Sequence, residues 1–116
     1  MSHPIVDAIN DVLSEHLGRY EPQGPIEWAD FMAALPELFT TLGDEWARLG
    51  DKLTSEFPMA GMPSGDMWGD MTGTTKGLAD HAEELHQQFE RDFELELKRA
   101  REPRPGEPVL DVQNDQ

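Results

Sequence analysis

The chain of 116 residues carries 24 acidic and 9 basic side chains, which gives a formal net charge of −15, and it has no cysteine. This length limits it to one domain, and the lack of cysteine excludes disulfides, thiol catalysis and thiolate metal sites. No apolar run approaches the ~18 residues of a membrane span, and so acidic a surface repels phosphate backbones, which argues against direct nucleic-acid binding.

Residues 3–17 predict a first amphipathic helix, with Pro4 in its first turn. Apolar residues recur along it at intervals of three and four, as on one face of a helix: Ile5, Ile9, Val12, Leu13 and Leu17. Gly18 is a stop signal, and the proline- and glycine-containing residues 21–25 predict a turn before the next helix.

The same N-terminal stretch argues against a Sec-type signal peptide. Asp7, Asp11 and Glu15 lie within it, and no early lysine or arginine precedes them. We therefore expect a cytoplasmic protein, while export by a route other than Sec remains open.

Residues 26–57 predict the longest helix and carry the most regular pattern in the chain. Its large apolar residues alternate steps of four and three without a slip: Trp28, Met32, Leu35, Phe39, Leu42, Trp46, Leu49 and Leu53. That period of 3.5 is typical of the seam between two supercoiled helices. We therefore expect this helix to pack along the seam against another helix, in the same chain or in a second copy.

A column of small or unusual residues runs beside this seam. Ala29, Pro36, Gly43 and Gly50 are spaced by seven. A glycine inside a helix costs about 1 kcal/mol and a proline about 3, so the column predicts a neighbouring helix at close approach and a kink at Pro36. A break at Pro36 is the alternative. The predicted helix interface therefore comprises the eight seam residues together with Gly43 and Gly50.

Residues 58–73 predict a connector rich in glycine and methionine. Flexible methionines often form adaptable binding surfaces, which makes this segment a candidate partner surface. Its members are Met59, Met62, Met67, Trp68 and Met71. The alternative is that these side chains plug the end of a helical hairpin, and the sequence does not decide between the two.

Residues 74–101 predict the last helix, so that residues 1–101 form one helical domain. Its apolar stripe consists of Leu78, Ala82, Leu85, Phe89, Phe93 and Leu97. Pro103 ends the helix, and residues 102–116 predict a flexible acidic tail with too few apolar residues to fold alone.

No residue pattern indicates catalysis or a cofactor. His86 and Glu90 stand four apart on one predicted helix, as metal ligands sometimes do, but no second pair accompanies them. There is no Walker A motif, no dinucleotide fingerprint and no nucleophile elbow. We therefore predict no enzyme activity, no catalytic or cofactor-binding residue and no metal site.

The pattern over residues 26–101 resembles the small Trp-x-Gly (ESAT-type) helical-hairpin proteins of actinobacterial type VII secretion. The resemblance implies dimers that form a four-helix bundle, and partner binding or export without catalysis. The chain departs from that family in four features. Trp68 and Gly69 are adjacent, and the connector is longer and richer in proline. An extra N-terminal helix is present, and Tyr20 is the only tyrosine, so the family's C-terminal Tyr-x-x-x-Asp/Glu signal is missing. Residues 102–107 resemble accessory proteins of actinobacterial mobile elements.

The sequence thus predicts an all-α protein, built on a long antiparallel hairpin with an extra N-terminal helix, that dimerises into a bundle. We expect a non-enzymatic protein–protein interaction module, with itself as partner and room for another protein. In a rival arrangement the first helix completes a three-helix monomer. The alternative function is an acidic inhibitor or decoy, a DNA mimic that binds a basic protein cleft, because the charge of −15 suits it.

Overall fold

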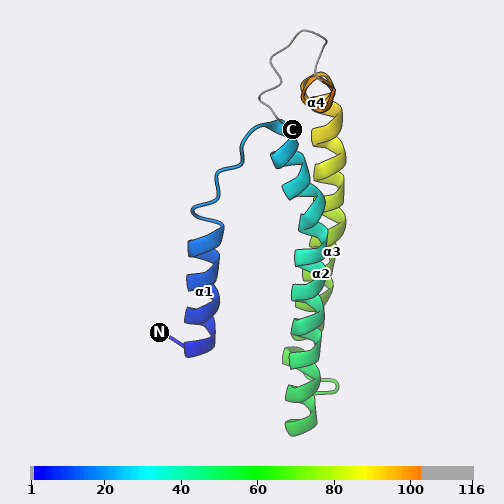
Figure 1. The fold of residues 1–116 in the computed structure, drawn as a ribbon. Coiled ribbons are helices and arrows are strands. Elements are labelled where there is room, and N and C mark those ends of the chain that lie inside the picture. The colour runs from blue at the N-terminus through cyan, green and yellow to red at the C-terminus, as the bar shows by residue number, and fades with distance from the viewer. Residues whose placement is uncertain (1, 103–116) are drawn as a thin grey trace.

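The computed structural model describes residues 2–102. Four helices follow one another: α1 (Pro4–His16), α2 (Pro25–Glu56), α3 (Pro63–Asp92) and α4 (Glu94–Arg101). The described part of the chain has no strand, which confirms the all-α prediction. α2 and α3 form a long antiparallel hairpin, and α1 stands beside α2 (Figure 1). Most of the predicted acidic tail, residues 103–116, lies outside the described residues.

α1 occupies the predicted amphipathic segment. The His3 side chain caps it, because its Nδ1 accepts a hydrogen bond from the Ile5 amide at 3.2 Å. α1 contacts none of the other three helices, and no residue in it is buried. Within residues 2–102, its apolar stripe therefore packs on no other helix.

α2 runs unbroken through Pro36, so the alternative of a break at this residue is wrong. Figure 1 shows the upper part of α2 slanting relative to the rest of the helix. A proline inside a helix removes one backbone hydrogen bond and pushes away the preceding turn. The heptad pattern continues in phase on both sides of Pro36, and this favours one bent helix over two.

The predicted connector at residues 58–73 is too long, because α3 already begins at Pro63. Proline is well suited to the first turn of a helix, where its missing amide would have no partner. The glycines that follow weaken the local helix preference, but Trp68 packs against α2 and stabilises this stretch. The actual turn is short and includes Gly61 at a φ of 79°, a conformation that favours glycine.

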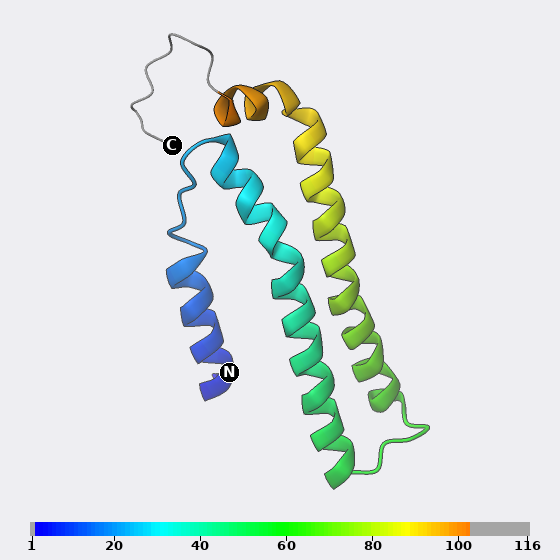
Figure 2. The same ribbon diagram turned by 45° about the vertical axis from the view of Figure 1, so that its right-hand side comes forward.

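The predicted last helix at residues 74–101 is also wrong in one respect, because it breaks at Phe93. The backbone there has φ −118° and ψ 32°, and α4 leaves in a new direction across the end of the hairpin (Figure 2). No proline or glycine marks the break. Its physical reason is packing: the turn places Leu97, only 1% exposed, among α2, α3 and α4.

The hairpin has little core of its own. Among residues 2–102, the only buried hydrophobic residues are Ala29, Ala82 and Leu97. The radius of gyration is 20.2 Å, against about 13 Å for a compact chain of this length. Two packed helices thus form a single layer, and much of their apolar surface stays open on one side.

Candidate interaction surface

The small-residue column of α2 is where α3 approaches. Ala29 is fully buried, and Gly43 is buried as well. A Cβ atom on Gly43 would lie 2.5 Å from Cγ of Lys76, and one on Gly50 would lie 2.5 Å from Nε1 of Trp68. Such distances are too short for a real side chain, so these glycines permit the close helix contact.

Trp68 joins the two helices near the turn of the hairpin. Its ring stacks on Trp46 with the centroids 4.2 Å apart and the planes inclined by 10°. Its Nε1 also donates a hydrogen bond of 3.0 Å to the backbone oxygen of Trp46. Trp68 therefore lies in the contact between α2 and α3, and its assignment to the predicted partner surface needs correction.

We expect Gly50→Ala to lower the melting temperature, since the added methyl group collides with the Trp68 indole. Gly69→Ala is the matched control, because a Cβ there meets no atom within 4 Å. Without a collision, the change from glycine to alanine inside a helix stabilises by up to about 1 kcal/mol. Thermal unfolding followed by circular dichroism measures both variants, and equal shifts in the two would contradict the close approach at Gly50.

Contact along the small-residue column turns part of the predicted seam toward solvent. Leu42 and Leu49 are each 50% exposed and Trp28 is 42% exposed. The other seam residues are partly buried: Met32, Leu35, Phe39, Trp46 and Leu53. The seam of α2 is thus shared between the contact with α3 and an open apolar stripe.

α3 carries a matching stripe. Met67, Met71, Leu78 and Leu85 are 41–64% exposed, and they recur at steps of four and seven, which place them on one helix face. Each is followed by a residue that α3 turns toward α2 or partly buries: Trp68, Thr72, Ala79 and His86.

The two stripes lie on the same side of the hairpin. In α2, Leu42 and Leu49 directly precede the contact residues Gly43 and Gly50, and the stripe of α3 precedes its own inward-facing residues in the same way. One residue is a rotation of about 100° around a helix. In an antiparallel helix pair, the positions directly before the contact residues of the two helices therefore lie on the same side of the pair. We call this side the apolar face, comprising Leu38, Leu42, Leu49, Met67, Met71, Leu78 and Leu85.

The remaining members of the predicted methionine surface surround the turn of the hairpin. Met62 is 52% exposed where α3 begins. Met59 is partly buried and, with Leu53, Gly65 and Trp68, lines an open hollow of about 280 Å³. This volume falls just short of the range typical of small-molecule sites, about 300–1,000 Å³. Met67 and Met71 belong to the apolar face instead.

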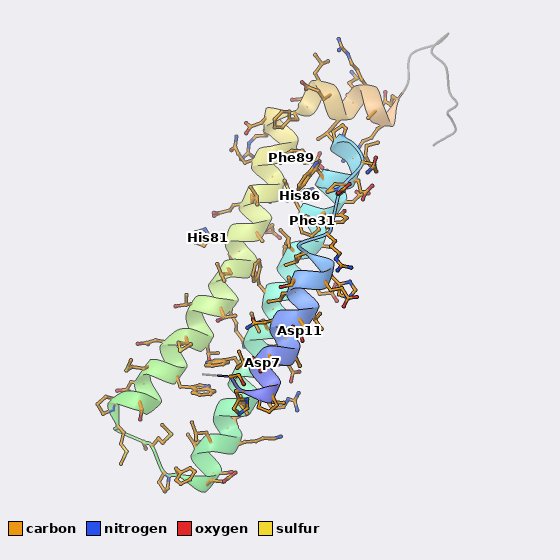
Figure 3. All side chains as sticks on the ribbon, turned by 90° about the vertical axis from the view of Figure 1, so that its left-hand side faces the viewer. Asp7, Asp11, Phe31, His81, His86 and Phe89 are labelled. Carbon is orange, nitrogen blue, oxygen red and sulfur yellow. The ribbon has the colours of Figure 1, made fainter. Side chains whose placement is uncertain are left out.

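A charged cluster joins α4 to α3 at the opposite end of the hairpin. Arg101 donates to both oxygens of the Glu90 carboxylate at 3.0 Å each, and Nε2 of His86 lies 3.1 Å from the same carboxylate. Figure 3 labels His86 and Phe89 on α3 and Phe31 on α2, all toward this end of the hairpin. The hydrogen bonds from Arg101, and then the one with His86, lower the pKa of Glu90 below its ordinary value.

This cluster attaches α4 to α3 through the bonds between Arg101 and Glu90. Sequence reasoning noted His86 and Glu90 but missed Arg101, which reaches Glu90 only because the chain turns at Phe93. Across residues 2–102, no three histidine, aspartate or glutamate side chains gather in a way that could hold a metal ion.

We expect the attachment of α4 to weaken as the pH falls below about 4.5, the ordinary pKa of a glutamate. A carboxylate whose pKa is lower in the folded state stabilises the fold above its unfolded pKa, and this contribution disappears as the pH falls through the folded pKa. Exposed ion pairs contribute at most about 1 kcal/mol, so α4 should loosen while the hairpin persists. Hydrogen exchange of α4 amides from pH 6 to pH 3 measures this.

Glu90→Gln should remove most of that pH dependence, whereas Glu83→Gln, at an exposed position on the same helix, should leave it unchanged. Equal behaviour of the two variants would show that Glu90 does not fasten α4.

Comparisons with protein-family models, with curated proteins and with solved structures find no match to this chain. In the part of the chain that the structure describes, none of the helices has the length and apolar character needed to cross a membrane.

Proposed function

We propose that this protein is a non-enzymatic helical interaction module that pairs with a second copy through the apolar face. The observation that carries the proposal is the seven half-exposed apolar side chains on one side of a hairpin that buries so few hydrophobic residues itself. Two such hairpins, placed face to face, form a four-helix bundle. The 3.5-residue period of α2 is the period that such packing requires.

The free energy gained by burying the apolar face is comparable to the free-energy cost of bringing two copies together. Full burial of a large apolar side chain gains roughly 1.5–3 kcal/mol, so covering a half-exposed one gains of order 1 kcal/mol. Seven on each copy give of order 14 kcal/mol in total. Association itself costs roughly 4–15 kcal/mol, which offsets a large part of this gain and, at the upper end of the range, all of it. We therefore expect a dimer that dissociates on dilution.

Symmetry favours a second copy as the partner. The same apolar face on both copies makes a two-fold interface that closes on itself and leaves neither face exposed. A different protein would have to supply its own apolar face of matching length and period.

The net charge of −15 per copy opposes this pairing and gives a direct test. Salt screens repulsion between like charges, so the dimer fraction should rise between 0.05 M and 0.5 M sodium chloride. Sedimentation velocity over a range of concentrations measures it. The alternative function, an acidic decoy, makes a different prediction. Its binding to a basic protein should weaken as salt rises, since salt screens attraction between opposite charges. A monomer at every concentration and salt level would contradict the proposal.

A further inference from the structure

α1 presents a second apolar stripe, which none of the other helices among residues 2–102 covers. Its large side chains are 44–63% exposed: Ile5, Val6, Ile9, Val12 and Leu13, with Leu17 just beyond its end. α1 nevertheless lies alongside the hairpin, on the side of α2, in both views (Figures 1 and 2). A helix so placed, and touching no other helix, leaves two apolar surfaces open in one molecule.

The link between α1 and α2 holds α1 in this position. The Leu17 amide donates to the Leu13 oxygen at 2.8 Å, and the Tyr20 amide donates to the Leu17 oxygen at 3.2 Å. The Tyr20 ring then packs on Phe31 of α2, with the centroids 5.0 Å apart. The link is thus fastened to α1 at one end and to α2 at the other.

The position of Phe31 shows which side of α2 the link leaves from. Phe31 precedes Leu38 by seven residues, so both lie on the same side of the helix. The fastening at Tyr20 and Phe31 therefore continues the apolar face toward the end of the hairpin. α1 leaves α2 from the side that carries the apolar face, and it runs in the opposite direction to α2 (Figure 2).

We propose that α1 and the apolar face together grip a second copy, so that each α1 packs on the hairpin of the other molecule. This inference rests on the proposed function and names the second surface of the same interface. Two-fold symmetry covers both α1 stripes and both hairpins at once. In this arrangement the two apolar faces cover each other, and the 13 residues of α1, which span about 20 Å, pack along the edge of the other hairpin beside that contact. In the single chain α1 contacts none of α2, α3 and α4, so the second copy supplies the surface on which its stripe packs.

The orientation of the charges agrees with this arrangement. Asp7 and Asp11 lie along α1 (Figure 3), on the side of the helix opposite Ile5 and Ile9. With the apolar stripe against the second copy, these carboxylates face solvent, where a charge is not desolvated.

The absence of cysteine from the sequence makes crosslinking between copies a clean test. Two singly substituted full-length proteins are mixed, one with Ile9→Cys and the other with Leu42→Cys, Leu78→Cys or Leu85→Cys in turn. A short bifunctional maleimide and mass spectrometry then identify linked pairs. We expect a linked pair of different chains from at least one combination. Asp11→Cys, on the opposite side of α1, should give at least tenfold less product with the same partners.

A second measurement uses the same helix. Ile9→Asp combined with Val12→Asp should weaken dimerisation at least tenfold in sedimentation, whereas Ser14→Asp, on the side of α1 away from Ile9 and Val12, should not change it. Circular dichroism checks that the hairpin stays helical in both variants.

The outcomes separate this inference from the proposed function. A dimer with no crosslink between copies and no effect of the α1 substitutions would overturn the inference and leave the proposed function intact. A linked monomer from a chain carrying both cysteine substitutions, with no link between chains, would show that α1 packs on its own hairpin. A protein that is monomeric throughout would overturn both.

Discussion

Leu42→Asp and Leu49→Asp should each turn the dimer into a monomer that keeps its helical hairpin. Both leucines are half-exposed in the single chain, so an aspartate at either position is solvated in the monomer. In the dimer the same carboxylate is buried without a partner, which costs roughly 3 kcal/mol or more. Because the interface is two-fold, each substitution acts twice. The dissociation constant of the dimer should rise at least ~100-fold.

Thr41→Asp is the control for both variants. It adds the same charge to the same helix at an exposed position, one residue away from the apolar face. Light scattering coupled to chromatography gives the mass, and circular dichroism gives the helix content. Unchanged mass in both leucine variants would place the interface elsewhere, and loss of helix in both would show that these side chains stabilise the hairpin itself.

Trp68→Ala should destabilise the hairpin by about 3 kcal/mol, the lower end of the range for removal of a packed tryptophan. The substitution removes both the stacking on Trp46 and the hydrogen bond to its backbone oxygen. Trp68→Phe keeps an aromatic ring but loses the donor and part of the stacked area, so its cost should lie between the ~1 kcal/mol of a hydrogen bond and the cost of the alanine variant. Urea unfolding measured by circular dichroism determines both values.

The neighbouring Met67 provides the contrast. It is 64% exposed and belongs to the apolar face, so Met67→Ala should weaken dimerisation while the unfolding free energy of the single chain stays within about 0.5 kcal/mol. If Trp68→Ala proved as mild as Met67→Ala in the unfolding measurement, Trp68 would belong to a binding surface and not to the hairpin contact.

The helical nature of the chain and its hairpin could be predicted from sequence because they depend on local periodicity. The steps of four and three along α2 require a helix, and the spacing of Gly43 and Gly50 indicates where another helix comes close. Gly50 also shows the limit of this reasoning. Its spacing predicts a close contact, but only the structure identifies Trp68 as the group that fills the space.

The helical structure of the first third of α3 could not be predicted from the local sequence. Pro63 and the regularly spaced glycines that follow it favour a loop, and the helix forms there because Trp68 packs on α2, twenty-two residues back along the chain. This misprediction concealed half of the α3 stripe, because it assigns Met67 and Met71 to a connector and not to a helix.

The break at Phe93 has no local signal either. It follows from the burial of Leu97, a tertiary contact that the stripe pattern does not distinguish from a continuation of the same helix. The bond from Arg101 to Glu90 depends on that turn. The ion pair could therefore be found only once the path of the chain was known.

The solution mass of the full-length protein tests the central claim most directly. Light scattering coupled to chromatography, from a few micromolar to several hundred micromolar and at moderate salt, is combined with circular dichroism. Pairing through the apolar face predicts a helical species whose mass rises with concentration toward twice 13.1 kDa. A helical species that stays at 13.1 kDa over the whole range would contradict it and would favour a monomer closed by α1.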